Sequence, residues 1–247
     1  MQENTRKRGL SEGVLKAIAM LAMLIDNAAV IILSEVLKKG MLTAYPVETW
    51  YKACRMFGRI AFPIFCFLLV EGFFYTKNRV KYVAILAITA AISEIPFNLA
   101  FYKTLGYSKH QNVFFTLFIG LLMVFAIQEF REKILPKITK HRNMLALLVQ
   151  LAIILGGGFL ANFIGCEYGF LGIIALMGIY ILRFNKSYLC ICEALYFLAT
   201  RSIQSMAALA FIPIWFYNGK RGKMEYLLPI FYPLQLLLLY GIYRIVL

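Results

Sequence analysis

Long apolar stretches fill most of this chain, and its charged residues stand in short runs between them. A helix needs about 20 mostly apolar residues to cross the hydrocarbon core of a bilayer. The pattern therefore predicts nine membrane spans, at residues 13–33, 56–75, 82–102, 112–130, 144–164, 168–182, 188–199, 203–217 and 226–246. The predicted fold class is all-α, a polytopic transmembrane bundle in which residues 1–247 form a single integral membrane domain.

The count of nine depends on residues 188–217. The two predicted spans in this stretch are short, and Arg201 is the only strong break between them. They could instead form one long tilted helix, which would give eight spans.

The distribution of basic residues predicts the orientation, because basic loops are retained in the cytoplasm. With nine spans, the connections on one side carry sixteen Lys and Arg and those on the other side carry eight. The richer side includes the N-terminal segment, so we expect a cytoplasmic N-terminus and an outer C-terminus. With eight spans, the two sides would differ much less in their number of Lys and Arg. The basic-residue bias therefore favours nine spans.

Composition supports a lipid environment: the chain is 62% hydrophobic and 15% charged, with a mean hydropathy of +0.75. Its net charge of +14 comes from basic residues in the loops between spans. Basic loops of this kind reflect the orientation of a membrane protein and do not indicate a nucleic-acid partner. Five cysteines lie mostly in or beside apolar stretches, and only His110 and His141 could join them. We therefore expect membrane lipids as surroundings and no metal site.

Polar residues inside the predicted spans are the candidates for function, since a charge at the bilayer centre costs about 2.5 to 3.5 kcal/mol on insertion scales. These residues are Asp26, Asn27, Arg59, Glu71, Glu94, Asn98, Asn112, Thr116, Glu193 and Gln235. The predicted directions put a subset in the outer half, namely Asp26, Asn27, Arg59, Glu94, Asn98 and Asn112. Glu167 follows at the outer start of the sixth span.

This convergence predicts a polar cavity open toward the outside, in which Arg59 pairs with Asp26 or Glu94. The structural alternative is a buried ion-pair network that only fixes how the helices pack. Asn98 and Thr116 also have a structural interpretation, as hydrogen-bonding residues between helices.

Several ordered motifs carry a resemblance to a known family. They are LKAIAM at 15–20, MLID at 23–26, GRIAFPIF at 58–65, SEIPFN at 93–98, QNVFFTL at 111–117, EYG at 167–169 with Gly172, YNGKRG at 217–222 and FYPL at 231–234. Together they resemble the TraX family, in order and over most of the chain.

The resemblance implies a multi-pass acetyltransferase of the bacterial cytoplasmic (inner) membrane, a family known for acetylating the N-terminus of conjugative pilin. It implies acetyl-CoA as the acyl donor and an amine or hydroxyl acceptor near the outer face. A peptide, a glycan and a lipid-linked amine all remain open as acceptors.

Two positions depart from the family pattern. Where the family has His after Ile25 and Asp26, this chain has Asn27, and where it has His after Leu234, this chain has Gln235. Both amides keep hydrogen-bonding capacity but cannot take up a proton near neutral pH. The chain is therefore either a naturally altered member or a disabled variant, with little activity expected.

The candidate residues fall into three groups. The catalytic candidates are Asp26, Asn27, Glu94 and Gln235. The substrate-binding candidates are Arg59, Asn98, Gln111, Asn112, Glu167 and Tyr168. The cofactor-binding candidates are Asn218, Lys220 and Arg221, for which a tight turn that only sets topology is an equal alternative.

Two other functions compete with acetyl transfer. A transporter or flippase could bind a small anion or lipid headgroup through Arg59, although the paired halves typical of transporters are not visible in the sequence. A noncatalytic membrane binding protein is the third possibility. It is favoured only because Asn27 and Gln235 replace the two histidines of the family pattern.

Overall fold

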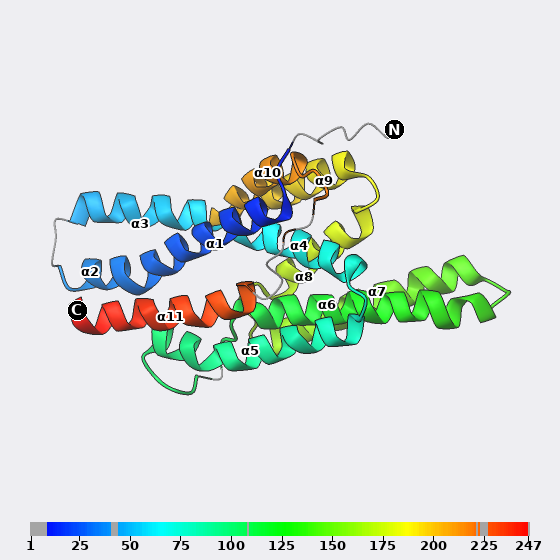
Figure 1. The fold of residues 1–247 in the computed structure, drawn as a ribbon, viewed down its shortest axis with the longest axis horizontal. Helices are drawn as coiled ribbons and strands as arrows, with labels where there is room; N and C mark the ends of the chain where they lie inside the picture. Colours follow the sequence, from blue (N-terminus) through cyan, green and yellow to red (C-terminus); the bar gives the residue numbers. More distant parts are fainter. Residues whose placement is uncertain (1–8, 41–43, 108, 221, 223–226, 247) are drawn as a thin grey trace, which may run out of the picture. The chain divides into compact units, whose positions relative to one another are not determined.

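The structure, a computed structural model, describes residues 9–40, 44–107, 109–220, 222 and 227–246. Every named element in these residues is helical (Figure 1). In chain order they are α1 (Glu12–Ala28), η1 (Ala29–Leu33), α2 (Ser34–Lys38), α3 (Ala44–Gly58), α4 (Ala61–Tyr75), α5 (Arg79–Tyr102), α6 (Val113–Glu129), η2 (Phe130–Ile134), η3 (Leu135–Lys137), α7 (Arg142–Phe163), α8 (Gly169–Leu182), α9 (Lys186–Ala199), η4 (Ile203–Ala210), α10 (Phe211–Trp215) and α11 (Leu227–Val246). The prediction of an all-α membrane bundle is confirmed.

Six helical stretches of the described chain are long and apolar enough to cross a membrane. They are Glu12–Lys38, Pro46–Tyr75, Arg79–Tyr102, Val113–Lys137, Arg142–Phe163 and Leu227–Ile245. Gly169–Leu182 and Ile203–Trp215 are shorter apolar helices, and α9 has 14 residues. A helix of that length rises only about 21 Å, less than the roughly 30 Å hydrocarbon core. The nine predicted segments are thus helical, and three of them are short for a full crossing.

The stretch between α9 and α10 settles how the predicted seventh and eighth spans are related. Helix α9 ends at Ala199, Arg201 has a left-handed φ of 48°, and η4 begins at Ile203. Both η4 and α10 pack against α9. One long tilted helix is therefore not formed here.

Helix α3 is the main departure from the predicted elements. Residues 44–55 fall in a predicted outer connection for which no element was expected, and the structure shows a helix there. They form a helix whose polar face carries the Glu48–Lys52 ion pair, with 2.6 Å between Nζ and Oε1. An amphipathic helix of this kind has no long apolar run, so hydropathy alone does not find it.

Contacts divide the chain into two compact units. The first unit is Met1–Leu68 with Phe184–Leu247, and the second unit is Leu69–Arg183. The prediction of a single membrane domain remains a prediction.

In the first unit, α1 packs against α3 and α11. The Leu10 N–H donates to the Phe216 carbonyl oxygen (2.8 Å), and the Asn218 N–H donates to the Leu10 carbonyl oxygen (2.9 Å). Lys186 Nζ donates to the Tyr217 carbonyl oxygen (3.1 Å). Three connections that were predicted to share the cytoplasmic side therefore meet at one end of this unit, whereas α11 ends beside α2 (Figure 1).

In the second unit, α6 packs against α5, α7 and α8. A Cβ atom at Gly157 would overlap the Met123 side chain, so this glycine lets α7 approach α6 closely. At one end Arg79 Nη1 donates to Glu132 Oε2 (2.8 Å), which joins two of the predicted cytoplasmic loops. At the other end of this unit, Gln111 and Cys166 form an isolated parallel β-bridge.

We predict that a topology reporter fused after Lys140 or after Lys220 reports the cytoplasm, and that one fused after the last residue reports the outside. The reason is the basic-residue bias together with the shared end of the first unit. Alkaline phosphatase and fluorescent-protein fusions in bacterial cells measure this. An outside signal after Lys220 would contradict the nine-span order.

Candidate functional site

The predicted polar residues form two clusters, one inside each unit. We call Asp26, Arg55 and Arg59 the Asp26 cluster, which lies in the first unit. We call Glu94, Asn98 and Asn112 the Glu94 cluster, which lies in the second unit. The predicted outer cavity that would include both stays a prediction.

Asp26 is the centre of the first cluster. It is only 7% exposed on α1, and its Oδ2 accepts hydrogen bonds from Arg55 Nη1 (2.7 Å) and from Arg59 Nη2. Of the two predicted partners of Arg59, the structure shows Asp26. Arg55 was not among the predicted site residues, although its spacing of four residues from Arg59 was a usable signal, since such residues share a helix face.

The Asp26 cluster carries more positive than negative charge. Two guanidinium groups surround one carboxylate, and Asp26 Oδ1 is buried without a hydrogen-bond partner among the described residues. Guanidinium groups stay charged, and their field is strong where water is scarce. Among its three members, the cluster therefore has one positive charge in excess.

Gly58 makes the close contact between α1 and α3 possible. A Cβ atom at this position would overlap the Asp26 side chain. Glycine thus places the carboxylate directly against the helix that carries Arg55, and a larger residue would push the ion pair apart.

Asn27 and Gln235 are buried amides in the first unit, 8% and 3% exposed. Asn27 Nδ2 and both polar atoms of the Gln235 side chain have no hydrogen-bond partner within the described parts of the chain. Gln235 is on α11, which packs against α1. A buried polar group without a partner costs about 1–3 kcal/mol, so such groups point to a bound water or ligand.

The Glu94 cluster joins α5 to the start of α6. Asn112 is fully buried and caps α6 by accepting from the Phe114 N–H (3.0 Å). Its Nδ2 donates to the Ala90 carbonyl oxygen (2.9 Å) and to Glu94 Oε2 (2.6 Å). Asn112 therefore has a clear structural role, and it fixes the orientation of the Glu94 carboxylate.

The loop before α8 lies against this cluster. The Gln111 N–H donates to the Gly165 carbonyl oxygen (2.9 Å), and the Glu167 N–H donates to the Gln111 carbonyl oxygen (3.1 Å). The Tyr168 N–H lies 3.4 Å from Thr116 Oγ1. The structure thus brings Gln111, Glu167 and Tyr168 together with Asn112, and the outward position of Asn112 and Glu167 stays a prediction.

Cys166, in the same loop, is buried and was not among the predicted site residues. Burial raises the pKa of its thiol to about 11, with a smaller opposing effect from Thr116. The thiol therefore stays protonated at neutral pH and behaves as a small apolar group.

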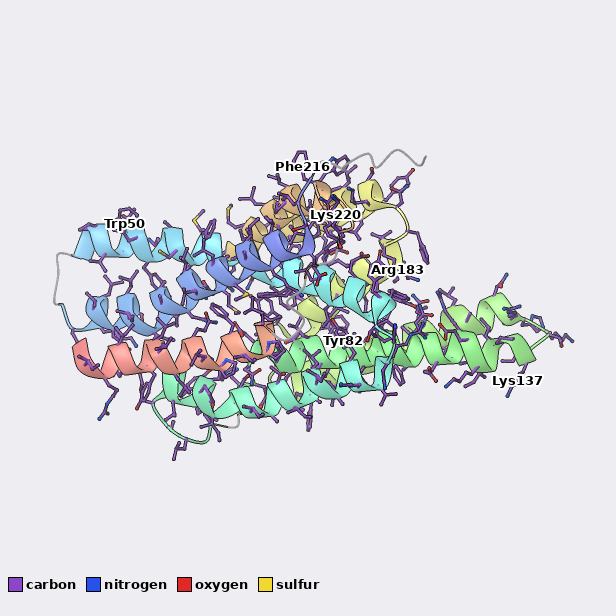
Figure 2. All side chains as sticks on the ribbon, viewed as in Figure 1. Trp50, Tyr82, Lys137, Arg183, Phe216 and Lys220 are labelled. Atoms are coloured by element: carbon purple, nitrogen blue, oxygen red, sulfur yellow. The ribbon has the colours of Figure 1, made fainter. Side chains whose placement is uncertain are left out.

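The turn after α10 holds the predicted cofactor residues Asn218 and Lys220. Asn218 Nδ2 donates to the Gly9 carbonyl oxygen, and the Lys220 N–H donates to Asn218 Oδ1, both at 2.9 Å. Lys220 is exposed and labelled in Figure 2 near Phe216. Asn218 thus organises a turn, while Arg221 lies outside the described residues.

Comparison with known proteins identifies relatives over nearly the whole chain. The family model described as "TraX protein" matches residues 11–243. The chain is 27% identical to a protein of Dichelobacter nodosus named "Probable fimbrial assembly protein FimC, serogroup H1", over 91% of this chain and 92% of that protein. No solved structure gives a significant match.

We predict that Asp26→Asn lowers the free energy of unfolding by about 3–5 kcal/mol, because it removes the buried carboxylate that pairs with Arg59 and with the half-buried Arg55. Thermal and denaturant unfolding of the purified protein in detergent measures the change.

Glu48→Gln is the matched control, since it removes the carboxylate of an exposed ion pair on α3. It should leave the melting temperature unchanged. Equal melting temperatures for Asp26→Asn and Glu48→Gln would show that the Asp26 cluster contributes nothing to stability.

Proposed function

Because the chain belongs to the TraX family, we propose that it is a multi-pass membrane acetyltransferase of the bacterial inner membrane, with its N-terminus in the cytoplasm. It moves an acetyl group from acetyl-CoA to an amine or hydroxyl acceptor near the outer face. The observation that carries this proposal is the pair of buried amides Asn27 and Gln235, on which Asn27 Nδ2 and both polar atoms of Gln235 have no partner among the described residues. They occupy the positions where the resembled family has histidines, and they share a unit with the Asp26 cluster.

The reaction needs a nucleophile, a proton acceptor and a leaving group. The acceptor nitrogen or oxygen attacks the thioester carbonyl carbon, a new bond to the acetyl carbon forms, and the carbon–sulfur bond breaks. The acceptor's proton passes to a base, and the sulfur leaves as a thiolate that takes up a proton. In the family pattern, imidazoles at 27 and 235 would supply the base.

Arg55 and Arg59 supply positive charge for this chemistry. The tetrahedral intermediate carries an oxyanion, and a charge placed in advance in a water-poor site stabilises it. The cluster's net positive charge, with Asp26 fixing both guanidinium groups, suits that role or the binding of another anionic part of the substrates. Asp26 here orients the arginines.

The proton acceptor is the component that this chain lacks at positions 27 and 235. Neither amide can accept a proton near neutral pH. The carboxylates Asp26 and Glu94, each with one oxygen that has no partner among the described residues, are the two remaining candidates for the base.

The relative from Dichelobacter nodosus favours one class of acceptor. Its name assigns it to fimbrial assembly, and fimbriae are built from protein subunits. We therefore place a peptide ahead of a glycan or a lipid-linked amine.

A noncatalytic binding protein is the second candidate function. It is favoured by Asn27 and Gln235, which keep a buried polar environment without a titratable group. In that case the site would bind the same ligands and turn them over no faster than the reaction proceeds in water.

We predict that Asn27→His combined with Gln235→His raises acetyl transfer by about a hundredfold to ten-thousandfold, the usual value of general acid–base catalysis. Transfer of labelled acetyl from acetyl-CoA to a peptide acceptor, with purified protein in lipid nanodiscs, measures the change.

The combined Asn27→Ala and Gln235→Ala protein is the control, and it should stay at the level of the unmodified chain. If the unmodified chain already turns over as fast as the double-His protein, neither imidazole is the base, and that role passes to Asp26 or Glu94.

We also predict that Lys220→Glu, made in the double-His protein, raises the KM for acetyl-CoA about threefold to tenfold and leaves kcat unchanged. Lys220 is exposed on the predicted cytoplasmic side, where CoA phosphates would meet basic groups. Steady-state kinetics measures both constants. Lys140→Glu, at another exposed basic loop position, is the matched control, and an equal effect there would remove Lys220 from the donor site.

A further inference from the structure

Basic residues from three connections gather at one end of the second unit. Arg79 begins α5, Arg131 is in η2, and Arg183 follows α8. The same end carries Lys137, at the tip of the hairpin that α6 and α7 form (Figure 2). Together, segments 71–81 and 129–142 and residue 183 contain nine Lys and Arg and only three Glu. This end of the unit therefore attracts anions.

Side-chain interactions show that the three arginines lie near one another. Arg79 Nη1 donates to both carboxylate oxygens of Glu132, the residue that follows Arg131 in the chain. Arg131 and Arg183 interact electrostatically with each other and with Tyr180. Two neighbouring guanidinium groups repel each other, and an anion that contacts both would relieve the repulsion.

The two neighbouring arginines are held in place by groups that carry no charge. The Arg183 guanidinium lies 3.9 Å from the centroid of the Phe74 ring, and its Nη1 donates to the Tyr180 carbonyl oxygen (2.9 Å). Arg131 Nη2 donates to Gln150 Oε1 (2.7 Å). The amide orients Arg131 without cancelling its charge. A guanidinium has five N–H donors in one plane, an arrangement that suits the oxygens of a phosphate.

Carboxylates balance only part of the positive charge at this end. Three of the nine cations are offset by a glutamate, in the pairs Lys133–Glu129, Arg79–Glu132 and Arg183–Glu71. The other six form no ion pair within the described chain, namely Lys77, Lys81, Arg131, Lys137, Lys140 and Arg142. A partner with a net negative charge is therefore favoured over a zwitterionic one.

Exposed apolar side chains lie beside Arg131 on α7. Leu147 and Leu151 are within one turn of Gln150, which holds Arg131, and they are 57% and 45% exposed. Met144, one turn before Leu147, is also exposed. In a chain that spans a membrane, such side chains contact the acyl chains of lipids. A soluble phosphate would use only the charges, whereas a lipid uses the charges and the apolar face together.

The position of Arg131 along the chain fits the depth of lipid phosphates. Arg131 comes 19 residues after Asn112, the N-cap of α6. At about 1.5 Å per residue this is about 28 Å, close to the roughly 30 Å thickness of the hydrocarbon core. With Asn112 at the predicted outer boundary, Arg131 reaches the headgroups of the opposite leaflet.

We propose that Arg131 and Arg183 bind the phosphate of an anionic membrane lipid, of the phosphatidylglycerol class. The phosphate accepts hydrogen bonds from the guanidinium groups, and an acyl chain lies along Leu147 and Leu151. Basic pockets between membrane helices on the cytoplasmic side bind such headgroups. The site lies within the second unit and uses none of the acetyl-transfer groups, so it does not depend on the proposed function.

The test measures the binding of single lipids. The full chain in detergent is titrated with dioleoylphosphatidylglycerol, with dioleoylphosphatidylcholine and with glycerol 1-phosphate, and native mass spectrometry gives each affinity. Phosphatidylglycerol should bind at least tenfold more tightly than phosphatidylcholine, which is zwitterionic, and than glycerol 1-phosphate, which has no acyl chains.

Arg131→Gln keeps a polar side chain and removes one charge, and it should lower the affinity for phosphatidylglycerol about fivefold. Arg183→Gln should have a similar effect, and it decides the matter if Arg131→Gln fails to fold. Lys109→Gln is the matched control. It removes one exposed positive charge from the same unit, beside the Gln111–Cys166 bridge at the other end, and it should leave the affinity unchanged.

The proposal is overturned if phosphatidylcholine binds as tightly as phosphatidylglycerol, or if a folded Arg131→Gln protein keeps the affinity of the unmodified chain. An equal loss in Lys109→Gln would also overturn it, because total charge and not this end would then determine binding. If glycerol 1-phosphate binds as tightly as the lipid, the site takes a soluble phosphate and the lipid assignment is wrong.

Discussion

The ion pairing of Asp26 with Arg55 and Arg59 is the interaction on which the first unit depends. Charges in a low-dielectric interior must be paired, and here the pairing requires α1 and α3 to approach until only a glycine fits at position 58. Because α11 packs against α1, the position of Gln235 follows from the same contact. The arrangement that neutralises the carboxylate thus also sets the place of both buried amides relative to the arginines.

The carboxylates of the two clusters, Asp26 and Glu94, are each held through one oxygen. Asp26 uses Oδ2 for two guanidinium groups, and Glu94 uses Oε2 for Asn112, while Oδ1 and Oε1 have no partner in the described chain. One oxygen of each carboxylate therefore holds neighbouring segments together, and the other oxygen can accept a hydrogen bond from a bound group. A purely structural carboxylate gains stability from using both oxygens, so leaving one open in each unit favours a role in binding.

The sequence predicted the helices that are apolar throughout, because hydropathy reports burial in lipid directly. It did not foresee the helical form of α3, because Glu48, Lys52 and Arg55 make this helix amphipathic. It predicted which residues would be polar and interior, including Glu94 and Asn112, but it could not predict their partners. Which oxygen is paired depends on rotamers and on helix contacts that are far apart in sequence.

Asn27 and Gln235 provide the strongest argument that the first unit is built around a ligand. Three buried polar atoms on these two side chains lack partners in the described chain, and each costs about 1–3 kcal/mol if it stays so. Leucine would fill either position without that cost, since it is apolar and of similar size. The chain instead keeps amides, which can still donate and accept hydrogen bonds but cannot accept a proton. What these positions retain is the ability to bind, and what they have lost is the ability to act as a base.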